Sequence, residues 1–370
     1  MKVFFISPYP TEGPSYRYRV EQYFEYLGKN GVKYASRPFM TSKFYKIIYK
    51  PKNVLSKFIF FLLASILRCI DFLRAFKYDI IFIHLEAYPI GPPVLEFLWT
   101  KFGKPIIYDL DDAIYLASKE SKYKIVKLFK FSDKIKIIIN LAKEIIVCND
   151  YLKKYASNFK TEDRIHIIPT SLDTEIFVPI QNKDMNKNEL VIGWIGTHST
   201  LQYLCMLKNV FIHLSSKHNF ILKVVCNDPA LEIDGVKIIN KEWSLSSDVD
   251  DFQSLDIGVY PLPDNEWIKG KTGFKTIQYM AVGLPCVVSN LGRNKEIIRD
   301  GVNGFLANSE AEWIEKLSLL FENSELRKKM GLMGRETVEN SYSLKVNAPL
   351  FLELIKRVYN ERHENKFAAK

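Results

Sequence analysis

The first half of the chain alternates short apolar runs with longer stretches in which apolar residues recur at helical spacing. The short runs are rich in β-branched and aromatic residues and predict buried strands. They are VFFIS (3–7), DIIFIHL (79–85), PIIYDLDD (105–112), EIIVCND (144–150) and RIHIIPT (164–170). Because apolar strands that alternate with helices are typical of a doubly wound parallel sheet, we expect an α/β domain here.

The second half starts the same alternation again. A strand over ELVIGWIGTH (189–198) is followed by a helix, and further strands are predicted at FILKVVCND (220–228), VKIIN (236–240), DIGVYPL (256–262) and LPCVVSN (284–290). The pattern therefore predicts two Rossmann-like, doubly wound domains. Two such domains would face a central cleft between the carboxyl ends of their sheets, where these folds bind ligands.

A polar stretch with two prolines separates the halves and fits a domain linker. We place the first domain at 1–170, the linker at 171–179 and the second domain at 180–344. The final helix, expected over 345–364, is predicted to return and pack on the first domain.

The segment 52–76 differs from the other predicted helices, because its apolar run FIFFLLASIL has only ten residues and is too short to span a bilayer. Its polar residues fall near one side of a helix and leave a broad apolar face; they are Lys57, Ser65, Arg68, Asp71 and Arg74. Two interpretations stay open: a helix that faces the core, or an interfacial helix on anionic lipid. The basic run 121–136 would extend the second kind of surface.

Charge and composition narrow the class of protein. The chain has 370 residues, 47% hydrophobic and 14% aromatic, which excludes general disorder. The net charge of +10 lies in the first half, where residues 1–57 hold 11 basic and 3 acidic side chains. This bias favours an anionic partner, such as a membrane surface, a phosphorylated substrate or nucleic acid. The alternative is a lysine-rich composition whose lysines are simply solvated.

Cysteine usage and the N-terminus bear on location. The five cysteines form no CxxC pair, and Cys69 and Cys148 lie in apolar runs, as in reduced cytosolic proteins. The opening MKVFFISPYP breaks at prolines and predicts a first strand, not a signal peptide. We therefore expect a cytoplasmic protein.

The stretch 267–298 carries the strongest chemical signal. Lysines and glycines alternate just before a predicted helix that ends at Gly283; they are Lys269, Gly270, Lys271, Gly273 and Lys275. A glycine-containing loop before a helix offers backbone N–H groups and a positive dipole end to an anion, and lysines add charges suited to a diphosphate. The alternative is a lysine-rich surface loop.

A second glycine loop follows the strand at 189–195. Gly196, Thr197 and His198 would let a phosphate or sugar approach the backbone, whereas the alternative is a helix cap by Ser199 or Thr200. Trp243 precedes an acidic run and is a candidate for nucleotide contact, or else a core residue.

These motifs resemble glycosyltransferase family 4, which has the GT-B fold. IPTSLDTEIFVP (168–179) is similar to the interdomain signature of that family, and 256–306 is similar to its donor-site block. The resemblance implies a retaining, metal-independent transferase with no cofactor, because the nucleotide-sugar is a co-substrate. It is strongest to a subgroup often found in bacterial surface-polysaccharide biosynthesis. That subgroup implies a lipid-linked or polysaccharide acceptor, and the basic first half with its amphipathic segment 52–76 favours peripheral contact at the cytoplasmic membrane face.

The resemblance also implies residue roles on the donor side. Donor binding falls to Gly196, Thr197, His198, Trp243, Gly270, Gly273, Phe274 and Gln278. Lys271 and Lys275, with backbone N–H groups at 196–197 and 274–276, would stabilise the departing diphosphate. The chain departs from the family where two glutamates usually stand, because these positions read Gly270 and Gln278.

On the acceptor side, the loop and helix start after the first strand contain Gly13, Ser15, Arg17 and Arg19. The two arginines would hold a phosphate or a uronic acid, or else lie on a helix surface. His84 and Glu86, at the end of the strand 79–85, are expected near the cleft, although a buried structural histidine fits equally.

Asp111 and Asp112 are assigned to orienting acceptor or sugar hydroxyls, and the alternative is an N-terminal helix cap. Competing readings of the whole chain are an inactive GT-B nucleotide-sugar-binding or scaffold protein, a GT-B epimerase, and a nucleic-acid-binding protein. The last lacks a recognition motif, so we expect no nucleic-acid partner.

Overall fold

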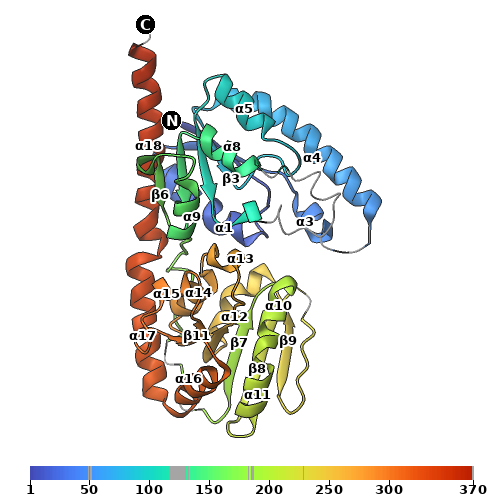
Figure 1. Ribbon diagram of the computed structural model, residues 1–370, viewed down its shortest axis with the longest axis vertical. Helices are drawn as coiled ribbons and strands as arrows, with labels where there is room; N and C mark the ends of the chain where they lie inside the picture. The colour runs from blue at the N-terminus through green and yellow to red at the C-terminus, as the bar shows by residue number, and fades with distance from the viewer. Residues whose placement is uncertain are drawn as a thin grey trace. The chain divides into compact units, whose positions relative to one another are not determined.

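The computed structural model describes residues 1–48, 50, 52–116, 131, 133–181, 183–184, 187–227 and 229–368, with side chains described up to Glu364. The chain forms two compact units (Figure 1). The first contains residues 1–171 and 347–370, and the second contains residues 172–346. The segment 172–179 thus belongs to the second unit.

The first unit is built on a parallel sheet of six strands. They are β1 (Lys2–Ser7), β2 (Lys33–Pro38), β3 (Ile80–His84), β4 (Ile106–Leu110), β5 (Glu144–Val147) and β6 (Ile165–Ile167). Their order is β2-β1-β3-β4-β5-β6, so the direction of winding reverses between β1 and β3. Loops at the carboxyl ends of strands beside such a reversal form the usual ligand site of this architecture.

The helices of the first unit cover the sheet and its edges. They are α1 (Pro14–Arg19), α2 (Phe24–Lys29), α3 (Ser42–Ile48), α4 (Val54–Arg74), α5 (Val94–Lys101), α8 (Lys134–Leu141) and α9 (Asp150–Ala156). The long helix α18 (Leu344–Ala368) adds its larger part to this unit. There Phe351 stacks on Tyr23 with ring centres 4.3 Å apart, and Glu361 pairs with Arg164 at 2.8 Å.

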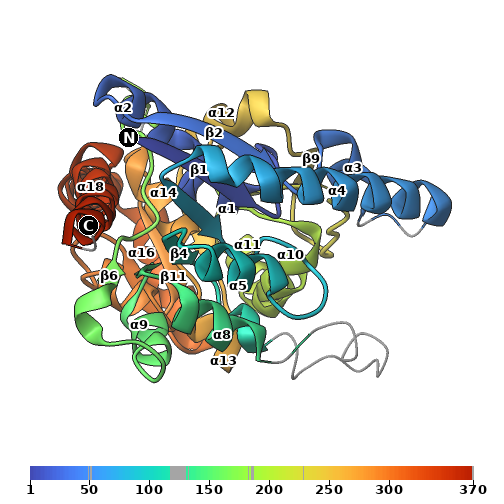
Figure 2. The same ribbon diagram turned by 90° about the horizontal axis from the view of Figure 1, so that it is seen from above.

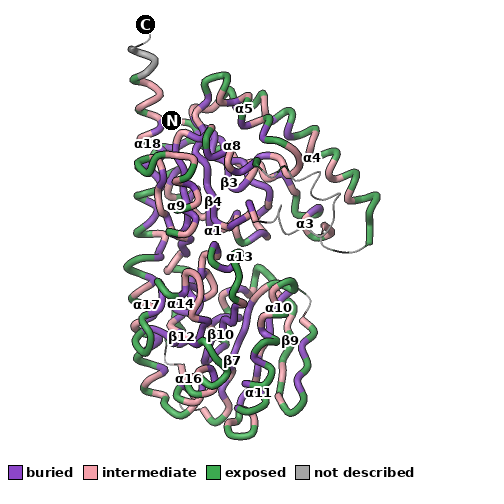
Figure 3. The backbone as a smooth tube through the Cα atoms, viewed as in Figure 1, coloured by how far each residue is buried: buried purple, intermediate pink, exposed green. Residues whose placement is uncertain are grey.

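Helix α4 lies along the outside of the first unit (Figure 2). Its polar side faces the protein, because Arg68 and Asp71 are only 2% and 1% exposed. Arg68 donates to the backbone carbonyls of Ser7 and Arg37. The apolar side is exposed, with Leu55 73% accessible, and Figure 3 shows exposed residues along the helix. The interpretation as a core-facing helix is therefore wrong for this apolar face.

The second unit has its own six-stranded parallel sheet. The strands are β7 (Leu190–Ile195), β8 (Phe220–Cys226), β9 (Ile238–Glu242), β10 (Ile257–Tyr260), β11 (Cys286–Ser289) and β12 (Phe305–Ala307). The order β12-β11-β10-β7-β8-β9 places the reversal between β7 and β10. This is the dinucleotide-binding order of strands, with the ligand crevice at the reversal.

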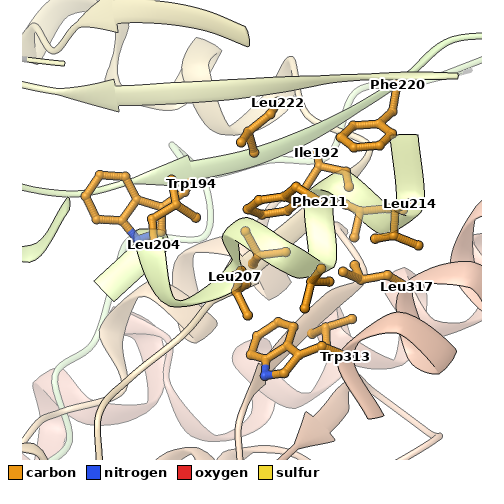
Figure 4. Packing of buried hydrophobic residues seen from close by; sticks show 14 of the residues in the cluster. Ile192, Trp194, Leu204, Leu207, Phe211, Leu214, Phe220, Leu222, Trp313 and Leu317 are labelled. Atoms are coloured by element: carbon orange, nitrogen blue, oxygen red, sulfur yellow. The ribbon is translucent and has the colours of Figure 1, made fainter. Parts of the chain in front are cut away.

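The surrounding helices are α10 (His198–Leu204), α11 (Lys208–Ser215), α12 (Asp248–Gln253), α13 (Glu266–Lys269), α14 (Phe274–Ala281), α15 (Asn294–Ile297), α16 (Glu310–Glu322) and α17 (Ser324–Ser341). Figure 4 shows side chains of the sheet, α11 and α16 meeting in one buried cluster, among them Ile192, Phe211 and Leu317. A Cβ on Gly258 would lie 2.6 Å from the ring of Tyr279, so glycine lets α14 approach the sheet closely.

The predicted fold class is confirmed by these two parallel sheets with flanking helices. The predicted strand 3–7 lies within β1, and the predicted strands 79–85 and 105–112 contain β3 and β4. The basic run 121–136 lies mostly outside the described residues. Within the described part of the chain, no helix is both long and apolar enough to cross a bilayer.

Candidate functional site

The loop before α14 is shaped by a glycine that no other residue replaces without strain. Gly273 has φ +66°, and a Cβ there would lie 2.6 Å from Ile297 Cδ1. The helix start is anchored by Thr276, whose hydroxyl donates to Asn294 Oδ1 at 2.8 Å. The first-turn N–H groups of a helix have no acceptor within the helix, so α14 begins with donors suited to an anion.

Lys275 lies where the sheet of the second unit reverses. Its Nζ is 5.9 Å from the ring centre of Trp194, on β7, and 5.2 Å from that of Tyr260, on β10. Burial, and then the positive charge of Lys271, lower the pKa of Lys275 from 10.5 to about 8. Both causes disfavour the charged ammonium, and the negative charge of an anionic ligand at this position would offset them.

The other residues of this lysine-rich loop divide into two groups. The Lys271 ammonium lies 5.8 Å from the ring centre of Trp267 and close enough to affect Lys275. Lys269, by contrast, pairs with Glu266 at 2.5 Å. Gly270 is buried at the end of α13. The cationic site therefore consists of Lys271 and Lys275 without Lys269.

The loop at 196–198 differs from the prediction in its backbone donors. The amide of Gly196 donates to Val225 O at 2.9 Å, and that of Thr197 donates to Thr200 Oγ1 at 3.2 Å. The expectation that these two amides bind the diphosphate is therefore wrong in this structure, because both already have acceptors. Thr197 caps α10, while His198 is the exposed first residue of that helix. Thr197 and Thr200 form a capping box at the start of α10, so the predicted capping by Thr200 is present and is shared with Thr197.

The remaining donor candidates have varied environments. Gln278 is buried on α14, and Phe274 is the partly buried first residue of that helix. Trp243 donates from Nε1 to Asp248 Oδ1 at 2.9 Å, so its indole is fixed by a carboxylate. These positions leave the predicted roles of Gln278, Phe274 and Trp243 as predictions.

In the first unit, α1 attaches to the carboxyl edge of the sheet through a chain of side chains. Ser15 Oγ lies 2.5 Å from Asp111 Oδ2 and 2.7 Å from His84 Nε2. His84 Nδ1 is in turn 2.7 Å from Asp109 Oδ2. A Cβ on Gly13, just before α1, would lie 2.7 Å from Tyr9 Cβ, so the loop needs glycine there. The structure thus brings Ser15, His84 and Asp111, three separate candidates for the acceptor side, into contact, and His84 is fully buried.

Arg19 has a different position from the one expected. It is 2% exposed and forms a bidentate ion pair with Asp109, and it also donates to Ile168 O at 2.7 Å. Although burial opposes its charge, Asp109 raises the pKa of Arg19 above its ordinary value. Burial likewise opposes ionisation of Asp109, but Arg19 and His84 outweigh it and lower its pKa. The prediction that Arg19 holds an acceptor is therefore corrected: it is a buried structural partner.

The other acceptor candidates keep more exposure. Arg17 is partly buried, with its guanidinium 4.8 Å above the ring centre of Tyr18. Glu86 pairs with Lys134 at 3.0 Å. Asp112 Oδ1 accepts from the amide of Ala113 at 2.9 Å.

Sequence reasoning missed the central part played by Asp109. It lies within β4, where all five residues are buried, so its charge required a buried cation. A buried aspartate in the sequence therefore predicts a buried cation beside it, and Arg19, 90 residues earlier in the chain, is that cation. Sequence spacing does not show which distant arginine supplies it.

Two family models match the chain. Residues 26–176 match Glycosyltransferase Family 4, and residues 189–323 match Glycosyl transferases group 1. The chain belongs to the GT-B glycosyltransferases. Membership of this group supports a transferase that uses a nucleotide-sugar donor.

Solved structures share the fold of this glycosyltransferase over nearly its whole length. A glycosyltransferase from Rickettsia africae ESF-5 has 15% identity and a TM-score of 0.67, covering 96% of this chain and 98% of that one. HepE from Anabaena, in complex with UDP and glucose, has 13% identity and a TM-score of 0.65, covering 96% and 99%. WaaG, a glycosyltransferase involved in lipopolysaccharide biosynthesis, has 13% identity and a TM-score of 0.64, covering 95% and 99%.

Among curated proteins, spore coat protein SA of Bacillus subtilis (strain 168) is 33% identical over 66 residues. The match spans 17% of this glycosyltransferase and 18% of that protein. It concerns a short segment and carries no conclusion about the whole chain.

Proposed function

We propose that the protein is a retaining, metal-independent glycosyltransferase that moves a sugar from a nucleotide-sugar to a lipid-linked or polysaccharide acceptor at the cytoplasmic membrane face. The observation that carries the proposal is the position of Lys275 at the reversal of the second sheet, beside Lys271 and the start of α14. Cations and helix N–H groups at such a reversal are suited to a nucleoside diphosphate.

Charge stabilisation without a metal is the reason to expect no divalent cation. Departure of a nucleoside diphosphate builds negative charge on its oxygens, and fixed positive groups lower that barrier. Lys271, Lys275 and the first-turn amides of α14 would supply this charge. Retention of configuration rests on the family resemblance. It requires no nucleophile from the protein if the acceptor attacks from the side on which the diphosphate departs.

The nature of the donor is suggested by the neighbours. HepE has been solved with UDP, with UDP and glucose, and with UDP-glucose. A uridine diphosphate sugar is therefore the first donor to try. Gly270 cannot supply a carboxylate to the sugar, so the contacts to the sugar would differ from those of relatives with glutamate there.

Membrane contact is proposed for α4. Its exposed face carries Val54, Leu55, Phe58, Leu62, Ile66, Ile70 and Leu73. Lysines precede and begin this face at positions 43, 46, 50, 52 and 57. An exposed apolar helix face beside clustered lysines fits a bilayer with anionic headgroups, since apolar side chains enter the interface and lysines contact phosphates. A membrane-bound acceptor would be reached from such a surface.

The test is thermal stabilisation by UDP-, GDP-, CMP- and dTDP-sugars in the presence of EDTA. We expect one nucleotide class to stabilise the wild type, because ligand at about 100 times its Kd adds roughly 2.7 kcal/mol. Lys275→Ala should lose this stabilisation. The matched control Lys269→Ala should keep it, because Lys269 is engaged with Glu266.

Stabilisation of the wild type that requires a divalent metal would overturn metal independence. Equal stabilisation of Lys275→Ala and Lys269→Ala by the donor would contradict the proposed diphosphate site at Lys275. Binding of a donor without transfer to any acceptor in membrane extracts would instead favour the inactive, nucleotide-sugar-binding alternative. The lack of a carboxylate at Gly270 is the observation in favour of that alternative.

A further inference from the structure

Four side chains at the carboxyl edge of the first sheet form a hydrogen-bonded chain that needs an extra proton. The contacts are Asp109 Oδ2 to His84 Nδ1 at 2.7 Å, His84 Nε2 to Ser15 Oγ at 2.7 Å, and Ser15 Oγ to Asp111 Oδ2 at 2.5 Å. Each of these contacts requires one proton between its two heavy atoms. The chain therefore needs three protons.

Ordinary charge states supply only two. Asp109 contributes none, because its bidentate pair with Arg19 keeps it ionised. A neutral histidine has one N–H and a serine has one O–H. The third proton must reside on His84 or on Asp111. Since an imidazole is intrinsically more basic than a carboxylate, we place it on His84.

Carboxylates lie on both sides of the His84 ring. Asp111 Oδ1 is buried, lies 4.0 Å from His84 Nε2, and has no hydrogen-bond partner among the described residues. Asp109 faces the ring from β4, and its charge is balanced by Arg19 of α1. Tyr23 and Cys148 lie close enough to influence Arg19. Two carboxylates thus flank the ring, and among the described residues only Asp109 pairs with an arginine or lysine.

The backbone beside His84 holds the ring in place. Leu85 has φ +60°, an uncommon conformation for a bulky residue. The amide of Leu85 donates to Asp109 O at 2.9 Å, and that of Glu86 donates to His84 O at 2.8 Å. Strained backbone persists where surrounding structure enforces it, which is typical of functional positions. His84 is thereby fixed between Asp109 and Ser15.

We propose that a proton shared among His84, Ser15 and Asp111 latches α1 and its preceding loop onto the sheet, with His84 as the imidazolium. Asp109 and Arg19 are positioning residues that hold His84 in this state. Without this proton, one of the three contacts has lone pairs on both atoms and becomes repulsive. The latch then opens, and α1 loosens from β3 and β4.

The latch bears on substrate binding, because Gly13, Ser15 and Arg17 are the candidates for acceptor contact. That consequence rests on the proposed function. The proton itself can be detected in the protein without donor or acceptor, so failure of the donor screen leaves this test unaffected.

The first experiment is nitrogen-15 NMR of the histidine side chains near neutral pH. The chain has six histidines, and His84→Gln identifies the signals of His84 by their disappearance. We expect both ring nitrogens of His84 to carry protons in the wild type. In Asp111→Asn the new amide donates to Ser15 Oγ, Ser15 donates to His84, and His84 becomes neutral with its proton on Nδ1. Asp112→Asn is the control and should match the wild type.

The second readout is hydrogen exchange of the α1 amides relative to those of β1. As the pH is raised, the wild type should lose protection in α1 relative to β1, because its chain of contacts needs a proton that the chain in Asp111→Asn does not need. Asp111→Asn should show no such loss, because its chain is complete without the extra proton. A neutral His84 in the wild type, or parallel exchange profiles for the two proteins, would overturn the proposal.

Discussion

At the residue scale, Lys275 couples the proposed donor site to pH. In the free protein its pKa is about 8, lowered by burial and by Lys271, so half of the ammonium has lost its proton at that pH. The proposed binding of a diphosphate requires the charged form. Above about pH 8 binding must therefore take up a proton, and the Kd of the donor is expected to rise about tenfold per pH unit.

Two variants test this linkage by titration calorimetry with the donor that stabilises the protein most. Lys275→Arg keeps its charge throughout, so its Kd should be flat over the same range of pH. Lys275→Ala should bind about 10- to 100-fold more weakly at neutral pH, the usual value of a hydrogen bond to a charged group. A slope in Lys275→Arg equal to that of the wild type would assign the proton to another residue.

The same residues show how far a site can be predicted from sequence. The glycine at position 273 and the lysines at 271 and 275 were found because spacing along one loop places them together. Arg19 was assigned to the acceptor because an arginine near a glycine loop resembles an anion site. Its partner Asp109 lies 90 residues later in the chain, and the two residues become neighbours only when β3 pairs with β4 and α1 packs at the end of the sheet. Local pattern carries no information on that contact.

At the scale of elements, α4 presents an apolar face away from its own unit. Phe58, Leu62 and Ile66 are all exposed on it. Changing these three residues to serine should leave the fold intact and reduce binding to anionic vesicles by at least about a hundredfold, since each buried apolar side chain contributes roughly 1.5–3 kcal/mol. Cosedimentation with vesicles that contain phosphatidylglycerol measures the effect.

The control is Leu332→Ser, which removes a similarly exposed leucine from α17 of the second unit. It should bind vesicles as the wild type does. The lysines predict a further sign: binding should weaken with added salt, because headgroup attraction is screened. If the triple variant bound vesicles as tightly as the wild type does, the apolar face of α4 would not be the membrane-binding surface.

The elements themselves were largely predictable because buried parallel strands read as continuous apolar runs. Strand β2, KYASRP, escaped prediction, since it lies at a sheet edge and none of its residues is fully buried. The amphipathic pattern of α4 was visible, but which face meets the protein was not. Arg68 pairs with Asp71 and donates to nearby carbonyls inside the unit, and such pairing lets a polar face pack inward.

At the scale of the whole molecule, the end of the chain stabilises a unit that begins at residue 1. Phe351 of α18 is 1% exposed, stacks on Tyr23 and contacts the ring of Phe82, with centres 5.2 Å apart. Phe351→Ala should therefore destabilise the first unit by about 3–5 kcal/mol. Hydrogen exchange followed by mass spectrometry should show lost protection in β1 and β3, while β7 and β10 keep theirs. Leu317→Ala, which empties a buried position of the second unit's core, should give the opposite pattern. Equal loss of protection in both sheets for either variant would mean that the two units unfold as one cooperative body. The proposed division into a donor-binding unit and an acceptor-binding unit would then not correspond to two separately stable units.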